Sequence, residues 1–277
     1  MSDFYTQTSL ACSQLITNRY STSFSLGIRM LHPSVRLDVY AIYGFVRLAD
    51  EIVDTYQDKN PTLELARFRE ETFRAIDSGI SFNPVLQAFQ ATVNRFQIDR
   101  SYIEAFLYSM ELDLHPQTYD QALYETYIYG SAEVVGLMCL RVFCQNNLPL
   151  FNELIHPARK LGSAFQKVNF LRDIKSDLED RERIYFPGLN VKSFTLEDKR
   201  KIEAEIEEEF REAQLGINRL PDNCRRGVQL ALTYYRGLLK KIRNSEPQTL
   251  LEKRVRISNF HKFRLLLANL VDLKPSF

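Results

Sequence analysis

The sequence has no tryptophan and few cysteines, and the pattern of its cysteines excludes two kinds of stabilisation. The four cysteines are Cys12, Cys139, Cys144 and Cys224. They form no C-x-x-C pair and have no histidine at zinc-ligand spacing, which argues against structural zinc and against a disulfide framework. We therefore expect them to be reduced core residues.

Long apolar runs and targeting signals are also missing. No stretch approaches the roughly 18 uninterrupted apolar residues of a membrane span. The N-terminus has no basic start followed by an apolar run, and the C-terminus shows no hydrophobic anchor. The sequence predicts a soluble, cytoplasmic protein and leaves a peripheral membrane contact open, for which the segment Phe263–Leu267 is one candidate.

Charge of one sign is not in excess either. The chain has 36 Lys and Arg against 35 Asp and Glu, so it has no global attraction to nucleic acid or to an anionic membrane, and any anionic ligand must be held by a local arrangement. No low-complexity linker and no repeat of 20–50 residues interrupts the chain. We therefore expect a single domain over residues 1–277, in an oligomeric state that the sequence does not set.

What the sequence does contain is a succession of helix signals. Caps followed by proline, or proline alone, predict helix starts at His32-Pro33, Asn60-Pro61, Asn83-Pro84, His156-Pro157 and Pro221. Gly79 and Glu246-Pro247 predict helix ends, and Thr195 with Asp198 resembles a capping box. Because no strand pattern is present, we predict an all-α fold, one large bundle of nine or ten helices.

One of these helices is apolar almost all round yet has a polar stripe. The stripe consists of Arg36, Tyr40, Tyr43, Arg47, Asp50 and Asp54, at helical steps of three and four. Burying these charges without partners costs several kcal/mol per group. The stripe should therefore line a cavity that holds something cationic; the alternative is a solvated face, or a structural ion pair between Arg47 and Asp50.

A second helix repeats this design. Gln166, Asn169, Asp173 and Asp177 follow one another at steps of three, four and four, and Arg172 lies beside them. Two facing carboxylate pairs repel unless cations separate them, and oxygen ligands without His or Cys suit Mg²⁺, with Mn²⁺ as an alternative. Mg²⁺ shares its ligands with substrate phosphates, so we expect a bound diphosphate with Arg47 and Arg172 as charge partners.

The segments Tyr43–Asp54 and Gln166–Asp177, followed by Arg183-Ile-Tyr-Phe-Pro187, resemble the squalene and phytoene synthase family, above all its bacterial phytoene synthases. Further matching pieces run from Ser21-Thr-Ser-Phe24 through Val134-Val-Gly136 to Arg254-Val-Arg256. The resemblance implies an all-α isoprenoid (terpenoid) synthase bundle with a central cavity. It also implies carotenoid biosynthesis by head-to-head condensation of two geranylgeranyl diphosphates to phytoene via prephytoene diphosphate. The alternatives are a dehydrosqualene or squalene synthase using farnesyl diphosphate, and a non-catalytic assembly protein of the same fold.

The resemblance also implies residue roles. The metal ligands would be Asp50, Asp54, Asn169, Asp173 and Asp177, and the other catalytic residues would be Arg47, Tyr43 and Tyr235. Substrate would contact Ser23, Phe24, Arg47, Tyr129, Val135, Gly136, Gln166, Asn169, Arg172 and Arg254, and more weakly Arg256. Val134, Met138 and Leu140 would line the apolar tunnel with Val135 and Gly136, and the choice between Tyr127 and Tyr129 is left open. The family commonly has Asp where Glu51 stands, but Glu51 lies off the stripe, and the lack of a dinucleotide fingerprint favours a reaction without NADPH.

Overall fold

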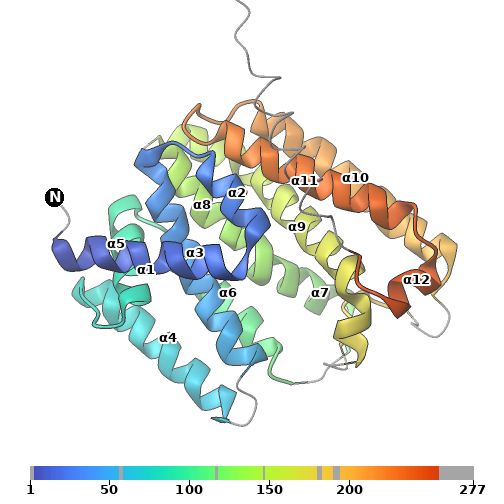
Figure 1. Ribbon diagram of the computed structural model, residues 1–277, viewed down its shortest axis with the longest axis horizontal. Coiled ribbons are helices and arrows are strands. Elements are labelled where there is room, and N and C mark those ends of the chain that lie inside the picture. The colour runs from blue at the N-terminus through green and yellow to red at the C-terminus, as the bar shows by residue number, and fades with distance from the viewer. Residues whose placement is uncertain are drawn as a thin grey trace, which may run out of the picture.

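The computed structural model describes residues 3–55, 59–115, 118–145, 147–179, 183–189 and 194–255. These residues form twelve α-helices and one π-helical turn, and their one β-type feature is an isolated bridge between Thr118 and Ile184. The helices are α1 (Phe4–Tyr20), α2 (Thr22–Arg29), α3 (Pro33–Asp54), α4 (Pro61–Ser78), α5 (Pro84–Phe96), α6 (Arg100–Leu112), α7 (Gln121–Ile128), α8 (Val134–Cys144), α9 (Leu148–Glu179), α10 (Leu196–Ile217), α11 (Arg225–Arg243) and α12 (Pro247–Glu252), and the π turn is Tyr129–Glu133 (Figure 1). The predicted all-α bundle is confirmed, but the described residues form more helices than the nine or ten expected. Arg256 and Phe263–Leu267 lie outside the described residues.

The sequence signals place several helix starts correctly. The side chains of His32, Asn60 and Asn83 accept hydrogen bonds from backbone N–H groups in the first turns of α3, α4 and α5. Each cap is followed by proline, which has no N–H to leave unpaired at that position. The predicted capping box of α10 forms as well, with Thr195 and Asp198 bonded reciprocally.

Two proline-based predictions are wrong, and the one at Pro247 is right about a helix end but misses a helix start. Pro157 lies inside α9, which begins nine residues earlier at Leu148, and its ring fits where α10 has Gly216: a Cβ there would be 2.4 Å from the Cβ of Pro157. Pro221 lies in a turn before α11, which begins at Arg225. Pro247 starts the short helix α12 as well as following the end of α11.

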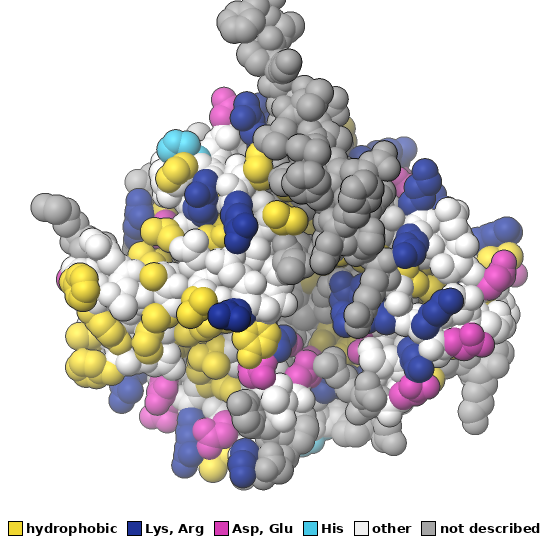
Figure 2. All heavy atoms as spheres, in the orientation of Figure 1, with side chains coloured by type: hydrophobic (Ala, Val, Ile, Leu, Met, Phe, Trp, Pro, Cys, Tyr) yellow, Lys and Arg dark blue, Asp and Glu magenta, His cyan; other side chains and the backbone are white. Residues whose placement is uncertain are grey.

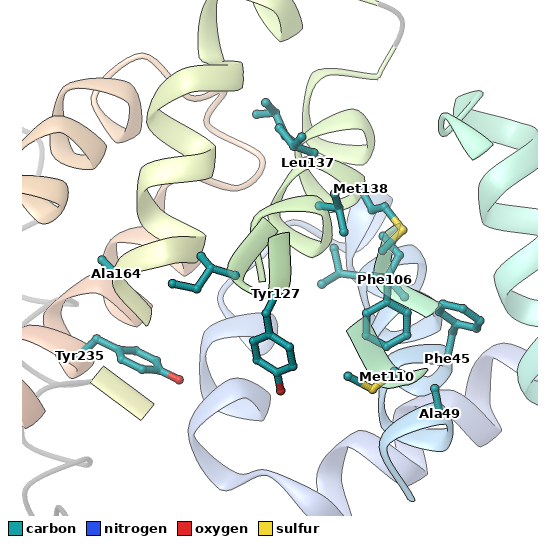
Figure 3. Packing of buried hydrophobic residues seen from close by; sticks show 14 of the residues in the cluster. Phe45, Ala49, Phe106, Met110, Tyr127, Leu137, Met138, Ala164 and Tyr235 are labelled. Atoms are coloured by element: carbon teal, nitrogen blue, oxygen red, sulfur yellow. The ribbon is translucent and has the colours of Figure 1, made fainter. Parts of the chain in front are cut away.

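The core fixes α3 in the middle of the bundle. The Phe45 ring stacks on Phe89 of α5 at 3.9 Å between centroids and packs against Phe106 of α6 at 5.4 Å. Figure 3 shows this cluster on one side of a space that Tyr235 enters from the other side, with Tyr127 between them. The buried side of α3 thereby directs its polar stripe toward α9 and α11.

The run Gln121–Cys144, formed by α7, the π turn and α8, is long and apolar enough to cross a membrane. Its most apolar window is 61% buried inside the bundle. On the face shown in Figure 2, basic and acidic side chains are interspersed over α10 and α11, in keeping with the balanced charge.

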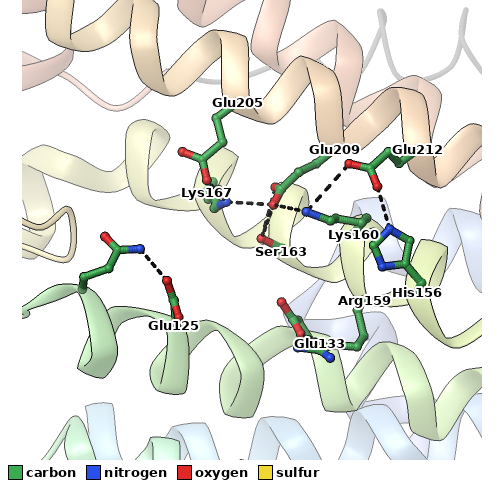
Figure 4. A network of polar contacts seen from close by, with 11 residues as sticks. Glu125, Glu133, His156, Arg159, Lys160, Ser163, Lys167, Glu205, Glu209 and Glu212 are labelled. Atoms are coloured by element: carbon green, nitrogen blue, oxygen red, sulfur yellow. Dashed lines mark hydrogen bonds and ion pairs between the residues drawn. The ribbon is translucent and has the colours of Figure 1, made fainter.

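The face of α9 that points away from the cavity is tied to α10 by a charge network (Figure 4). Lys167 Nζ lies 2.8 Å from Glu209 Oε1 and also bonds Glu205, while the Ser163 hydroxyl donates to Glu209 at 2.9 Å. The side chains of Lys167 and Glu209 are only 5% and 6% exposed. Burial raises the pKa of Glu209, so Lys167 is needed to hold this carboxylate ionised.

Lys167→Met should destabilise the fold by about 3 kcal/mol at neutral pH, because it leaves Glu209 buried without its main cation. The loss should shrink in acid, where Glu209 can take up a proton. Lys175→Met is the matched control, since Lys175 forms a more exposed pair with Glu179 that is worth at most about 1 kcal/mol. Urea unfolding at two pH values measures both; equal losses for the two variants would contradict the role given to Lys167.

Candidate active site

A cavity of about 650 Å³ opens between α2, α3, α8, α9 and α11. It is lined by most of the residues selected from the sequence: Phe24, Tyr43, Arg47, Asp50, Asp54, Val135, Gly136, Gln166, Asn169, Arg172, Asp173, Asp177, Tyr235 and Arg254. The side chain of Ser23 lies outside the described residues. The two acidic helices thus contribute to one site, although they are more than a hundred residues apart in the chain.

The polar stripe of α3 reaches this cavity with its C-terminal half. Arg47 bonds both Asp50 and Glu51, and its guanidinium lies 4.3 Å above the Tyr20 ring. Burial opposes the charge of Arg47, but the two carboxylates outweigh it, so its pKa is raised. Asp50 lines the cavity whereas Glu51 does not, which matches the prediction that set Glu51 aside.

The first half of the predicted stripe does not face the cavity. Arg36 donates from Nη2 to the Leu31 carbonyl oxygen at 2.8 Å, because the helix α2 ends beside it. Tyr40 is fully buried in the core. The straight stripe expected from helical spacing is therefore correct only from Tyr43 to Asp54.

On α9, one carboxylate has two arginine partners. Asp173 lies 3.0 Å from Arg172 Nε and 2.6 Å from Arg254 Nε. Burial opposes the charge of Arg172, but Asp173 outweighs it and raises the pKa of the guanidinium. Because two cations converge on one acid here, this end of the cavity is suited to bind a further anion.

Within the described residues, no three His, Cys, Asp or Glu side chains converge closely enough to hold a metal ion by themselves. What the cavity offers is a pair of aspartates from each of two helices, with the amide of Asn169 nearby. Mg²⁺ is usually bound by one or two carboxylates plus water and substrate phosphate. The oxygen-only donor set fits such a shared ion better than a site built from protein alone.

Aromatic rings cover the wall beside the acids. The centroid of the Phe24 ring lies 5.8 Å from that of Tyr43 and 6.3 Å from that of Tyr235, and Phe165 stacks on Tyr235 at 3.9 Å. The Tyr235 hydroxyl donates to Asn169 Oδ1 at 3.2 Å, and burial raises its pKa to about 12. These rings therefore stay neutral and present π faces that can stabilise a carbocation.

A second polar cluster on the cavity wall was missed by the sequence reasoning. Asp113 accepts hydrogen bonds from Tyr127 at 2.7 Å and Tyr185 at 3.2 Å, and lies 3.2 Å from Arg183 Nη1. The same Arg183 nitrogen is 3.9 Å from Oδ1 of Asp54. Burial raises the pKa of Asp113 to about 6, although Arg183 lowers it. Only the motif Arg183–Pro187 hinted at this cluster, because a buried arginine needs an acid.

The prediction that Tyr129 contacts substrate is wrong, because Tyr127 lines the cavity and Tyr129 does not. The Tyr129 ring lies under the Arg159 guanidinium, 5.1 Å away. Tyr127, Ser131 and Val135 are four residues apart, and the wide π turn between them keeps all three on the cavity wall.

The predicted tunnel lining is also corrected. Val135, Gly136 and Leu140 line the cavity, but Val134 and Met138 are fully buried in the core behind it. Cys139 lines the wall as well, and burial raises its pKa to about 12, so it remains a thiol. The four cysteines are free, with Cys144 and Cys224 buried and Cys12 and Cys139 only partly so.

Solved structures share this fold. A dehydrosqualene synthase crystallised with a ligand superimposes with a TM-score of 0.81 at 22% identity, over 97% of each chain. A squalene synthase from Alicyclobacillus acidocaldarius gives a TM-score of 0.76 at 20% identity, over 87% of this chain and 95% of the other. The architecture is therefore that of the terpenoid synthases, as predicted.

Sequence comparison leads to the same group of proteins. A phytoene synthase of Arthrospira platensis is 29% identical over 85% of this chain and 84% of its own length. A 4,4'-diapophytoene synthase of Staphylococcus haemolyticus is 25% identical over 92% and 93%. The sequence profile of squalene/phytoene synthases matches residues 17–261. The chain belongs to the squalene/phytoene synthase family.

Proposed function

We propose that this protein is a prenyltransferase that joins two geranylgeranyl diphosphates head to head to give phytoene. The observation that carries the proposal is the cavity itself, where five aspartates and three arginines line a space whose other walls are largely apolar and aromatic. A diphosphate fits the charged end, and a polyprenyl chain fits the apolar remainder.

The metal in this proposal is Mg²⁺, with Mn²⁺ as a substitute. Asp50, Asp54, Asp173 and Asp177 would hold it together with the side-chain oxygen of Asn169. When bound, the ion would supply Lewis-acid stabilisation of the leaving diphosphate. No NADPH is required, because the condensation to phytoene involves no reduction.

The protein's own residues act on charge as it develops. When the C1–O bond of the first substrate breaks, its electron pair leaves with diphosphate, and Arg47, Arg172 and Arg254 are placed to neutralise that charge. The allylic C1 cation adds to the C2–C3 double bond of the second substrate, and loss of a proton gives the cyclopropyl diphosphate. A second C–O cleavage, ring opening and loss of another proton give the conjugated triene. The neutral rings of Tyr43 and Tyr235 can face these cations.

The second candidate is condensation of farnesyl diphosphate to dehydrosqualene, which the diapophytoene synthase among the relatives supports. A non-catalytic assembly role is less well supported, because all four aspartates line the cavity. Purified protein incubated with Mg²⁺ and either substrate, without NADPH, separates these cases. We expect diphosphate release and a C40 hydrocarbon; a C30 hydrocarbon from farnesyl diphosphate alone would favour the second candidate, and no release from either would refute both.

Removing divalent metal should abolish turnover while leaving the fold intact. The carboxylate pairs belong to long helices whose cores do not depend on an ion, so chelation with EDTA should leave the circular dichroism spectrum unchanged. Added Mg²⁺ or Mn²⁺ should restore diphosphate release, whereas Ca²⁺, with its longer bonds and higher ligand number, should not. Full activity in EDTA would exclude the metal ligands proposed here.

A further inference from the structure

The helix α1 buries a row of polar residues and leaves large apolar side chains exposed among the polar ones on its outer side. The residues that it buries against α3 and α5 are Thr6, Ser9, Ser13 and Thr17. Its exposed side includes Phe4 at 85% exposure, Ala11 and Leu15 at 58%. Small hydroxyl residues allow α1 to approach α3 closely, as Ser13 does at Gly44. An ordinary surface helix buries its apolar face instead, so the exposed face of α1 calls for a partner.

A neighbouring turn extends this apolar surface. Ile80 and Phe82, between α4 and α5, are 53% and 89% exposed. Gln87 holds the turn beside α1, since its side chain accepts from the Ser81 N–H at 2.8 Å and donates to Thr6 Oγ1 at 2.8 Å. Figure 2 shows hydrophobic side chains gathered along α1 and just below it. We call Phe4, Leu15, Ile80 and Phe82 the α1 patch.

Within α1 and α2 the exposed charged side chains are basic, although the turn with Ile80 follows the exposed Asp77 of α4. Between Phe4 and Leu37 the sequence has no Asp or Glu, although the chain as a whole is balanced. Arg19 and Arg29 are exposed at the C-terminal ends of α1 and α2, and Arg29 lies within 3.5 Å of Asn18 of α1. Asp3 is exposed at the N-terminal end of the α1 patch and accepts a hydrogen bond from the Thr6 N–H as the N-cap of α1. An apolar face bordered by arginine matches the surface of an anionic bilayer.

The α1 patch also leads into the cavity. Tyr20 at the end of α1, Ser21 and Phe24 line the cavity, and Tyr20 and Phe24 are themselves 53% and 37% exposed. The end of α1 is therefore part of the cavity wall, and Glu51 of α3 contacts Tyr20 at this point.

We propose that the α1 patch, with Arg19 and Arg29, docks this protein on the surface of an anionic phospholipid bilayer, with Tyr20 and Phe24 of the cavity turned toward the lipid. The docking itself rests on exposure and charge alone; its purpose rests on the proposed function. Polyprenyl substrates and an oily product could then pass between bilayer and cavity without crossing water.

The test is co-sedimentation of the full chain with vesicles of phosphatidylglycerol and phosphatidylcholine, and with vesicles of phosphatidylcholine alone. The wild type should bind the anionic vesicles preferentially, and high salt should weaken that binding. A Phe4→Ser, Leu15→Ser, Phe82→Ser variant should bind about tenfold less. Arg19→Glu with Arg29→Glu should remove the preference for anionic lipid. Leu215→Ser on α10, 67% exposed, is the matched control and should bind as the wild type does.

The outcomes separate docking from other causes. All substituted side chains are exposed, so the circular dichroism spectrum and the activity on detergent-dispersed substrate should not change. Activity in detergent tests the proposed function, and vesicle binding tests the docking, so the two can fail separately. Undiminished vesicle binding by the triple variant, or equal binding to neutral vesicles, overturns the proposal. So does a dimer in sedimentation velocity that the same triple variant dissociates, because a second copy would then occupy the α1 patch.

Discussion

Asp54→Ala should lower the rate of diphosphate release at least about 10²-fold while the protein stays folded. Asp54 lines the cavity one turn from Asp50, and its carboxylate is one of the four that would share a divalent ion with the substrate. Losing a group that stabilises leaving-group charge in a water-poor site typically costs two to three orders of magnitude or more. Asp173→Ala should have an effect of the same size, because Asp173 is the corresponding residue on α9 and also orients Arg172 and Arg254.

Two controls make this result specific. Glu51→Gln, one residue from Asp50, should stay within about tenfold of wild type, since the side chain bonds Arg47 but does not line the cavity. Asp77→Ala removes a carboxylate from an exposed pair with Arg100 and should change nothing measurable. Steady-state release of diphosphate with saturating Mg²⁺, together with far-UV circular dichroism, gives both readouts. Near-normal rates for Asp54→Ala and Asp173→Ala would mean that the metal-binding end of the cavity lies elsewhere.

Helical spacing predicted the acid-bearing half of the site because the chemistry there follows the backbone period. Tyr43, Arg47, Asp50 and Asp54 lie on one unbroken helix, so steps of three and four place them together without knowledge of other elements. Capping rules worked for the same reason, since a cap bonds residues two or three positions away.

The failures needed information that helical spacing does not contain. Pro157 fits inside α9 only because Gly216 of a different helix leaves room for its ring. The π turn at Tyr129–Glu133 changes the helical period, so a constant spacing could not decide between Tyr127 and Tyr129. No second acid at helical spacing marks Asp113 as part of a site. Its partner Arg183 lies seventy residues later in the chain, and only the fold brings the two together.

Asp113 should give the enzyme an acid limb near pH 6 in its rate profile. Four groups face this carboxyl: Arg183, Tyr127 and Tyr185 in direct contact, and Asp54 through its charge. Ionised Asp113 holds Arg183, whose Nη1 is 3.2 Å from Asp113 and 3.9 Å from Asp54. Once Asp113 is protonated, Arg183 is drawn to Asp54 and competes with the divalent ion for that carboxylate. Activity should therefore rise as the pH increases through about 6.

Stability should follow pH in the opposite direction. The pKa of Asp113 is about 6 in the fold against an ordinary value of 3.8, so the folded protein binds this proton more tightly than the unfolded chain does. The associated stabilisation, on the order of 3 kcal/mol, is fully present below pH 3.8 and is lost as the pH rises through 6. Ionised Asp113, the form needed for activity, is thus the form with the lower free energy of unfolding.

Asp113→Asn tests both trends at once, because the amide keeps the shape of the side chain but cannot ionise. We expect turnover about tenfold to a hundredfold lower at pH 8, since Arg183 loses its acid partner, and an acid limb no longer centred near pH 6. The free energy of unfolding should also lose part of its decline between pH 4 and 7. Rates and urea denaturation measured across this range decide the matter. Tyr185→Phe is the control, because it removes the hydroxyl that donates to Asp113 and accepts from Tyr127 and Arg183 but keeps the carboxyl. If the acid limb persists near pH 6 in Asp113→Asn, the limb belongs to another group. Asp113 would then be only a structural partner of Arg183 and would not keep Arg183 away from Asp54.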